Sequence, residues 1–426
     1  MASKACRLLC ILSLLLLMLP LAGCRVYESS STAGVSTTTA AAREYILVGR
    51  VVPVTGPLAS FGIGSPYVEQ SAIDYINEHF GGVYIADEGR TIPLKLVYAD
   101  SDSSPATAYE AAVKLIQEDG IDIMVVSNTA DTVRPVSEAC ETYQIPCIST
   151  DAPVDVWLAG GPYKYSFHAF FDTANELSCL IDGWDLAATN RLVGIVAESD
   201  FEGEEIAAKL PVIAPARGYT TFDPGRYDSG TTDYSPIINQ LKAAGCEIIA
   251  GVMKAQDFAA FWQQCQVLGY KPKVCTIAKA CLFEEDMTAL GPLGDGLISE
   301  VWWSVDSPFR SSISGWTAAE LAKDYQAGTE SVYVPATVGY KHANVEIVYD
   351  ILKRAQSLDP ELLRAAAEQT DLDTVAGHIK FDSNHACIMG SVTGQWQIDA
   401  DGRFEQVIIA NKQIPEIAVS GEIKVF

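Results

Sequence analysis

The chain has 426 residues, of which 49% are hydrophobic and 19% are charged, and its formal net charge at pH 7 is −25. This length exceeds what a single core usually supports, so we expect two domains in the folded part. The acidic excess argues against nucleic acid as a partner, because neutralising phosphates requires clustered lysine and arginine. It also argues against tight contact with anionic lipid.

The first 23 residues have the pattern of an export signal. Two basic residues precede an apolar run over 8–21, and this run is shorter than the ~20 residues that a helix needs to span a bilayer. The run ends in Leu-Ala-Gly-Cys at 21–24, which resembles a bacterial lipobox, in which the cysteine is acylated and becomes the first mature residue. We therefore expect a signal peptide over 1–23 and a lipid on Cys24. An ordinary signal peptide is the alternative.

A segment rich in Ser, Thr and Ala follows, over 24–43. It shows no apolar periodicity, so it cannot bury a core and should stay disordered. As a flexible coil it would span about 24 Å on average. We expect a tether that holds the folded part at the outer face of the cell membrane, with the lipid as the only membrane contact.

From residue 45 the chain alternates strand-like runs with amphipathic helices. Four apolar runs predict strands, at 46–52, 94–98, 123–126 and 146–149. Apolar spacing of 3.6 residues predicts helices between them, starting at Pro66, over 106–118 and over 133–142. Strands separated by single helices run parallel with right-handed crossovers. This part therefore predicts one doubly wound lobe.

A second alternation follows, with strands predicted at 192–196, 248–252 and 273–277 and helices from Ser235 and over 257–268. Later elements are a strand at 297–303, a helix opened by a capping box at Thr317, a helix over 339–354 and hairpin strands at 379–381, 395–398 and 407–409. The two alternations predict an α/β fold with two Rossmann-like lobes.

Eight cysteines follow Cys24 in the sequence, at positions 140, 147, 179, 246, 265, 275, 281 and 387. Most lie in apolar patterns that are typical of buried thiols. The pairs Cys140/Cys147 and Cys275/Cys281 are close enough in sequence to bridge, and the sequence leaves their redox state open.

Enzymatic motifs are missing from the sequence. It contains no phosphate-binding loop, no nucleophile elbow and no zinc-binding helix motif. Carboxylates such as Glu198 and Asp200 more often lie solvated in loops than act as catalytic acids or bases. We expect no enzymatic activity, no catalytic residues, no cofactor and no metal.

The loop after the first strand, Thr-Gly-Pro-Leu-Ala-Ser-Phe-Gly at 55–62, and the helix at 72–77 resemble the branched-chain amino acid type of ABC-importer substrate-binding protein. The resemblance continues in order through 108–115, 145–149, 230–235 and 294–296, and covers essentially the whole chain after the tether. It implies a type I periplasmic-binding-protein fold, with three hinge crossings between the lobes. It also implies a monomer that closes on one small solute and delivers it to permease subunits. The alternative function is a ligand-sensing lipoprotein that signals through a membrane receptor.

The resemblance also implies lobe boundaries and pocket residues. We expect lobe 1 over 44–168 and 299–374, and lobe 2 over 169–298 and 375–426. Carried over by position, the ligand-binding residues are Phe61, Asn128, Thr129, Ala130, Asp151, Ala152, Phe201, Lys254, Lys279, Trp303, Tyr340 and His342.

This chain departs from the pattern of the amino-acid binders at its polar positions. Those binders typically grip the ligand with Ser-rich loops and a Ser/Thr pair, whereas this chain has Asn-Thr-Ala at 128–130 and Asp-Ala at 151–152. It also has Lys254 and Lys279 where an acidic or neutral group is common. A lysine in the cleft would favour a carboxylate. We therefore predict a small organic carboxylate, aromatic or branched, with an amino acid as second choice.

Overall fold

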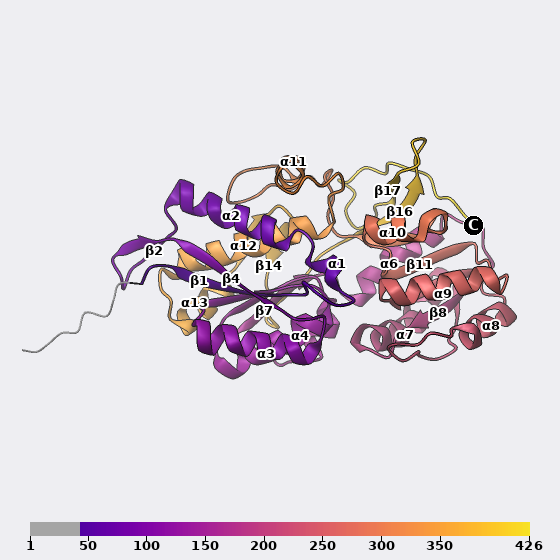
Figure 1. Ribbon diagram of the computed structural model, residues 1–426, viewed down its shortest axis with the longest axis horizontal. Coiled ribbons are helices and arrows are strands. Elements are labelled where there is room, and N and C mark those ends of the chain that lie inside the picture. The colour runs from indigo at the N-terminus through magenta and orange to yellow at the C-terminus, as the bar shows by residue number, and fades with distance from the viewer. Residues whose placement is uncertain (1–42) are drawn as a thin grey trace, which may run out of the picture. The chain divides into compact units, whose positions relative to one another are not determined.

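Two β-sheets with helices on both faces organise residues 43–426, the part of the chain that the computed structural model describes (Figure 1). The expected signal peptide, the lipid on Cys24 and nearly all of the expected tether lie outside the described residues. Within 43–426, no helix is both long enough and apolar enough to cross a membrane.

The first sheet has six strands in the order β15-β7-β6-β5-β1-β4, and all its pairs are parallel. Its strands are β1 (Ile46–Val52), β4 (Leu94–Asp100), β5 (Ile123–Val126), β6 (Cys147–Ser149), β7 (Ser166–Phe170) and β15 (Ala386–Ile388). The helices of this lobe are α1 (Ala59–Gly62), α2 (Ser65–Phe80), α3 (Pro105–Lys114), α4 (Ala130–Tyr143), α5 (Val154–Leu158), α11 (Ala318–Thr329), α12 (Thr337–Ala355) and α13 (Pro360–Ala367). Two small hairpins, β2 (Val83–Ile85) with β3 (Arg90–Ile92) and β13 (Asp371–Thr374) with β14 (Gly377–Lys380), complete it.

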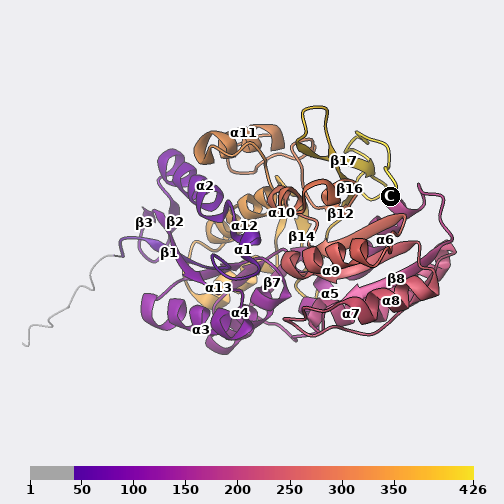
Figure 2. The same cartoon turned by 45° about the vertical axis from the view of Figure 1, so that its right-hand side comes forward.

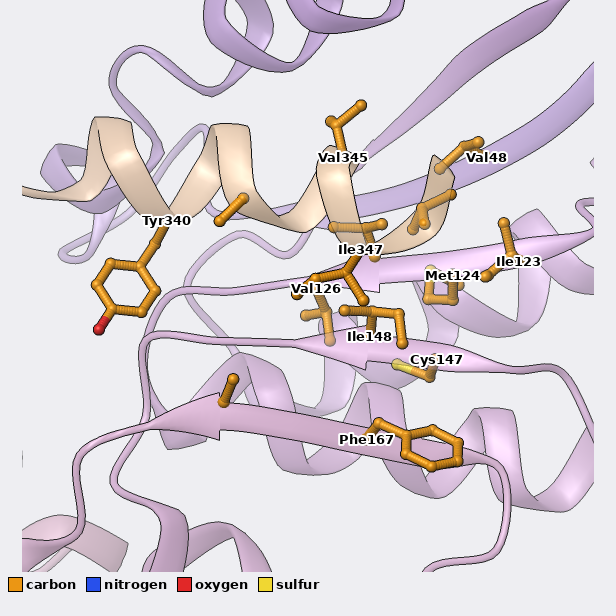
Figure 3. Packing of buried hydrophobic residues seen from close by; sticks show 14 of the residues in the cluster. Val48, Ile123, Met124, Val126, Cys147, Ile148, Phe167, Tyr340, Val345 and Ile347 are labelled. Atoms are coloured by element: carbon orange, nitrogen blue, oxygen red, sulfur yellow. The ribbon is translucent and has the colours of Figure 1, made fainter. Parts of the chain in front are cut away.

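Helices α2 and α12 lie on one side of the first sheet and α3 and α4 on the other (Figures 1 and 2). The buried helix α12 places Ile347 against Val126 of β5 and Ile148 of β6, whereas Val345 points away from these strands (Figure 3). Tyr340, near the start of α12, lies at the end of the sheet where β5, β6 and β7 finish (Figure 3). The core of this lobe therefore orients the N-terminal turns of α12 toward the carboxyl ends of the strands.

The second sheet has seven strands in the order β17-β16-β12-β11-β10-β8-β9, of which the five from β12 to β9 are parallel. The strands are β8 (Leu192–Ala197), β9 (Thr220–Phe222), β10 (Ile248–Met253), β11 (Val274–Lys279), β12 (Ile298–Val301), β16 (Val392–Ile398) and β17 (Phe404–Ala410). Its helices are α6 (Thr173–Trp184), α7 (Phe201–Ile213), α8 (Ser235–Ala244), α9 (Ala255–Val267) and α10 (Glu284–Leu290). Apolar side chains of α6 and α7 form one core cluster with this sheet, and those of α8 and α9 form another.

The chain passes between the two sheets three times: after β7, after β12 and between β15 and β16. Strand β15 pairs with β7 of the first sheet, although we expected residues 375–426 in the second lobe. Strand β12 remains in the second sheet through Val301, slightly beyond the expected boundary at 298. The difference arises because sheet membership depends on pairing between distant segments, which a local pattern does not reveal.

The cysteines of the described residues are all buried, unpaired thiols, including both candidate pairs. Burial raises the pKa of the Cys140 thiol well above its usual range, and the neighbouring Cys147 raises it further. These thiols therefore act as small apolar side chains in the two cores.

Candidate functional site

The loops that follow the strands of the two sheets meet between the lobes. The N–H of Ala130, which follows β5, donates a hydrogen bond to Glu202 Oε1 of α7 at 3.0 Å. Asp155 of α5 in the first lobe forms an ion pair with Lys209 of α7 in the second. Ligands of parallel α/β sheets bind beyond the carboxyl ends of the strands. In this protein the carboxyl ends of both sheets face one interface.

Two loops of the first lobe are joined by hydrogen bonds at this interface. The N–H of Thr129 donates to the Asp151 carbonyl at 2.8 Å, and Asn128 Nδ2 lies 3.3 Å from Asp151 Oδ2. All three residues have positive φ, at 82°, 64° and 62° for Asn128, Thr129 and Asp151. Such backbone conformations are costly for residues other than glycine and cluster at binding sites. The structure thus brings together the residues that we expected after β5 and β6.

Asp151 is buried, and its Oδ1 has no hydrogen-bond partner in the described part of the chain. Burial raises the pKa of its carboxyl group, and Lys341 opposes that rise. Lys341 Nζ donates to the carbonyl of Phe61 at 2.8 Å, and burial lowers its pKa to about 8. The hydroxyl of Tyr340 has no partner either, and burial and the charge of Asp151 raise its pKa. The sequence predicted Tyr340 as a ligand-binding residue but did not predict Lys341, because no local pattern distinguishes this lysine from other lysines of a helix.

Lys254 and Lys279, the two lysines that we expected in the site, are neutralised by carboxylates of their own lobe. Lys254 Nζ lies 2.7 Å from Glu198 Oε1. Lys279 Nζ lies 3.1 Å from Asp200 Oδ2 and 3.3 Å from Glu202 Oε2. Burial would lower the pKa of Lys279, but the adjacent Glu202 and Asp200 hold it well above its usual value. The idea that Glu198 and Asp200 are solvated loop charges is wrong, because both side chains are largely buried against these lysines.

Aromatic rings connect the two lobes near the strand ends. Phe61 packs edge-on against Phe283 of the second lobe, with ring centroids 4.8 Å apart, and stacks on Trp302 at 6.4 Å. Phe170 contacts both Trp302 and Tyr340, at 4.8 and 5.2 Å. Trp302, which directly follows β12, is therefore the tryptophan beside Phe61.

The structure does not place Trp303 with these residues. Its side chain is buried in the first lobe, where Nε1 donates to the Val375 carbonyl at 3.0 Å. Consecutive residues of an extended segment point to opposite sides, so only one of the two tryptophans can reach the interface.

His342 is also part of the core of the first lobe. Its Nε2 lies 2.8 Å from Ser311 Oγ and 3.5 Å from Glu346 Oε1. Burial lowers its pKa to about 4, so the ring is neutral at physiological pH. It lies two positions beyond Tyr340 on α12, which turns its side chain to another face of the helix.

Two further expected residues, Phe201 and Ala152, lie at the interface, the first at its edge and the second with its backbone carbonyl in a hydrogen bond. Phe201 is 44% exposed, and the Arg134 guanidinium of the first lobe lies 3.8 Å from its ring centroid. Phe201 therefore lies on the rim of the interface rather than within it. The Ala152 carbonyl accepts a hydrogen bond from His168 Nε2 at 2.7 Å, which fixes the loop after β6.

Three acidic residues of the second lobe join this site and were not foreseen. Glu176 begins α6, Glu202 begins α7 and Glu300 lies near the end of β12, and all three are buried. Burial raises the pKa of Glu202 and of Glu300 to about 7, and that of Glu176 well above its usual value. Single acidic residues in the first turn of a helix are common, and Glu300 comes from a strand far away in the sequence, so no local pattern predicted a cluster.

A family model described as "Periplasmic binding protein" matches residues 46–403. The chain belongs to the periplasmic binding protein family. A curated relative of this family, Leu/Ile/Val-binding protein homolog 8 of Brucella abortus, is 24% identical over 396 residues, which cover 90% of this chain and 95% of the relative. The family is one of solute-binding proteins of ABC transporters, which confirms the expected family and the absence of enzymatic activity.

Solved structures of periplasmic binding proteins share the fold. The leucine-binding protein of Thermotoga maritima has a TM-score of 0.71 at 15% identity, covering 85% of this chain and 97% of its own. A solute-binding protein of Rhodopseudomonas palustris in complex with 3,4-dihydroxybenzoic acid has a TM-score of 0.69 at 17% identity, covering 86% and 97%. A branched-chain amino acid binding protein of Streptococcus pneumoniae in complex with isoleucine has a TM-score of 0.68 at 18% identity, covering 85% and 98%. The predicted two-lobed α/β architecture is confirmed.

Proposed function

We propose that this periplasmic binding protein captures a small organic solute between its two lobes and delivers it to the permease of an ABC importer. In this proposal the lipid on Cys24 and the tether hold the protein at the outer face of the cell membrane, where it acts as a monomer. A solute that contacts both lobes stabilises the form in which they are closed.

One observation carries this proposal: buried polar atoms from both lobes lack hydrogen-bond partners in the described part of the chain. The first lobe offers Thr129 Oγ1, Asp151 Oδ1 and the Tyr340 hydroxyl, and the second offers Glu198 Oε2, Glu300 Oε2 and the Tyr227 hydroxyl. Each unsatisfied buried polar group costs about 1–3 kcal/mol. A bound solute that pairs with these atoms would remove that cost.

The relatives support a small organic solute. Related structures hold isoleucine or 3,4-dihydroxybenzoic acid, so the fold accepts both a branched and an aromatic molecule. The sequence favoured a carboxylate because of Lys254 and Lys279. Since both lysines pair with carboxylates of this chain, a simple carboxylate would have to displace those pairs.

A screen of small solutes by thermal shift, followed by small-angle scattering, tests the capture. A solute that binds only the folded protein raises its melting temperature. At saturation all molecules should be closed, so the radius of gyration should be that of the closed form and smaller than that of the open form. Thr129→Val, which removes one hydroxyl and keeps the shape, should weaken binding about tenfold. Thr142→Val, at an exposed position of the same helix, serves as the matched control. A ligand that binds equally well to both variants, with no effect on the distance between the lobes, would exclude the interface as the binding site.

A further inference from the structure

We propose that the solute held between the lobes is an organic cation, which carries an ammonium-type group and no compensating carboxylate. This inference rests on the proposed function and names the class of solute from the charges at the interface.

Every lysine at the interface already has an acceptor. Lys254 pairs with Glu198 and Lys279 with Asp200 and Glu202. Lys341 donates to the Phe61 carbonyl, and Asp151 is the carboxylate that most favours its charged form. A carboxylate ligand therefore finds no free positive charge on these three side chains.

Carboxylates outnumber the lysines at the same interface. Seven acidic side chains line the strand ends or the helices that follow them: Asp131, Asp151, Glu176, Glu198, Asp200, Glu202 and Glu300. Six of them, all except Asp151, are close enough for the charge of one carboxyl group to change the pKa of another. Lys254 and Lys279 contribute to the same pKa shifts. Asp151 lies in a loop next to this group: its backbone carbonyl accepts a hydrogen bond from the Thr129 N–H, and the N–H of the following residue, Ala130, donates to Glu202. The interface thus holds seven carboxyl groups against three lysines, and burial without enough counter-charge raises the pKa of several of them, including Glu176, Glu202 and Glu300.

Four of the carboxylates have an oxygen atom without a partner within residues 43–426: Asp151 Oδ1, Glu176 Oε2, Glu198 Oε2 and Glu300 Oε2. All four side chains are at least nine-tenths buried. The Tyr227 hydroxyl, whose pKa is raised by burial and by the charge of Glu198, also lacks a partner. Free acceptor atoms in a buried site require donors, and an ammonium group supplies up to three of them with a positive charge. A carboxylate ligand would add acceptors and negative charge instead.

The aromatic rings at the interface suit the same kind of ligand. Phe61, Trp302 and Tyr340 lie at the strand ends, near the acidic side chains. Ring faces attract organic cations, and a desolvated site strengthens this attraction. The rings also supply the apolar walls that are typical of small-molecule sites. Together these features favour an organic amine over a metal ion.

Ligand series that share a carbon skeleton and differ in their charged groups test the inference. Suitable sets are leucinamide with leucine and 4-methylpentanoate, and 4-hydroxybenzylamine with 4-hydroxybenzyl alcohol and 4-hydroxybenzoate, within a wider panel of amines and acids. We expect the tightest ligand of the panel to be a cation that binds at least about 100-fold more tightly than its carboxylate counterpart, measured by calorimetry on the folded protein.

Three results would overturn the inference. The first is a zwitterion, neutral molecule or carboxylate that binds more tightly than the cation of its skeleton, which would leave solute capture itself intact. The second is stabilisation by Mg²⁺ or Ca²⁺ in place of any amine. The third is that no member of any charge binds, which would count against solute capture as well.

Variants at the acidic side chains give a second, independent measurement. Glu198→Gln keeps the shape of the side chain and should weaken binding of the identified cation about tenfold or more. Lys254→Met frees the Glu198 carboxylate and should tighten it. Glu118→Gln, on the outer face of the first lobe, is the matched control and should change nothing. The reverse result, tighter binding by Glu198→Gln and weaker binding by Lys254→Met, would rule out a cationic ligand even if both variants are less stable than the parent.

Discussion

Glu202 of the second lobe accepts a hydrogen bond at 3.0 Å from the N–H of Ala130, the first residue of helix α4 in the first lobe. Thr129, at the N-cap position of α4, makes no capping hydrogen bond with its own side chain. A carboxylate at a helix N-terminus satisfies a free N–H and interacts favourably with the helix dipole. The second lobe therefore supplies the cap of a helix in the first, and contact between the lobes is coupled to the stability of that helix.

Removal of this cap should shift the protein toward a form with separated lobes. We expect Glu202→Ala to weaken solute affinity about fivefold, since a cap of this kind contributes about 1 kcal/mol. Scattering should report a larger radius of gyration without solute. Glu204→Ala, at an exposed position in the same first turn of α7, is the control. Equal effects of the two substitutions would show that the contact across the lobes contributes nothing to closure.

A second contact across the lobes is the stacking of Arg134 on Phe201, at 3.8 Å from the ring centroid. A double-mutant cycle with Arg134→Gln and Phe201→Leu should give a coupling of about 0.5–1 kcal/mol in solute affinity, because the pair forms only when the lobes meet. Arg191 and Tyr219 form a similar pair within the second lobe, at 4.9 Å. A cycle on that pair should show coupling in stability and none in affinity.

Glu300 should make the stability of the protein depend on pH. Burial raises the pKa of its carboxyl group from 4.5 to about 7. Between these values the folded protein keeps a proton that the unfolded chain has lost, so the contribution of this group to stability falls as pH rises from about 4.5 to about 7.

Glu300→Gln mimics the protonated form and should therefore be more stable than the parent at pH 8, by about 2 kcal/mol. Near pH 4 the two proteins should unfold at the same denaturant concentration. An increase in stability of the same size at both pH values would mean that packing, rather than ionisation, causes the difference.

The neighbouring tryptophans should separate stability from binding. Trp303→Phe removes the hydrogen bond to the Val375 carbonyl and some buried surface, so it should lower the free energy of unfolding by about 1–3 kcal/mol and leave solute affinity within about twofold. Trp302→Phe should weaken the binding of the solute instead. If Trp303→Phe abolished binding in a fully folded protein, our assignment of the two side chains would be reversed.

Several elements could be predicted from the sequence because their signals are local. Strand β1 lies exactly within the predicted run at 46–52, and the capping box at Thr317 forms with Glu320 as expected. The strands predicted at 395–398 and 407–409 pair as the hairpin of β16 and β17, with Asp-Gly at 401–402 in its turn. The loops after β5 and β6 could be found because a ligand site in an α/β protein follows strand ends. Helices α6 and α7 were missed, although Asp172 and Asp200 cap them with hydrogen bonds of 2.7 Å.

The sequence by itself determined the alternation of strands and helices, the family and many of the strand-end residues, because periodicity and capping are encoded within a few neighbouring positions. The tertiary structure alone decided which sheet β15 joins, which tryptophan reaches the interface and which carboxylate neutralises each lysine. Glu202 meets Ala130 across 72 positions of the chain. The charge of the site is a sum over such distant residues, so it emerges only when the two lobes are brought together.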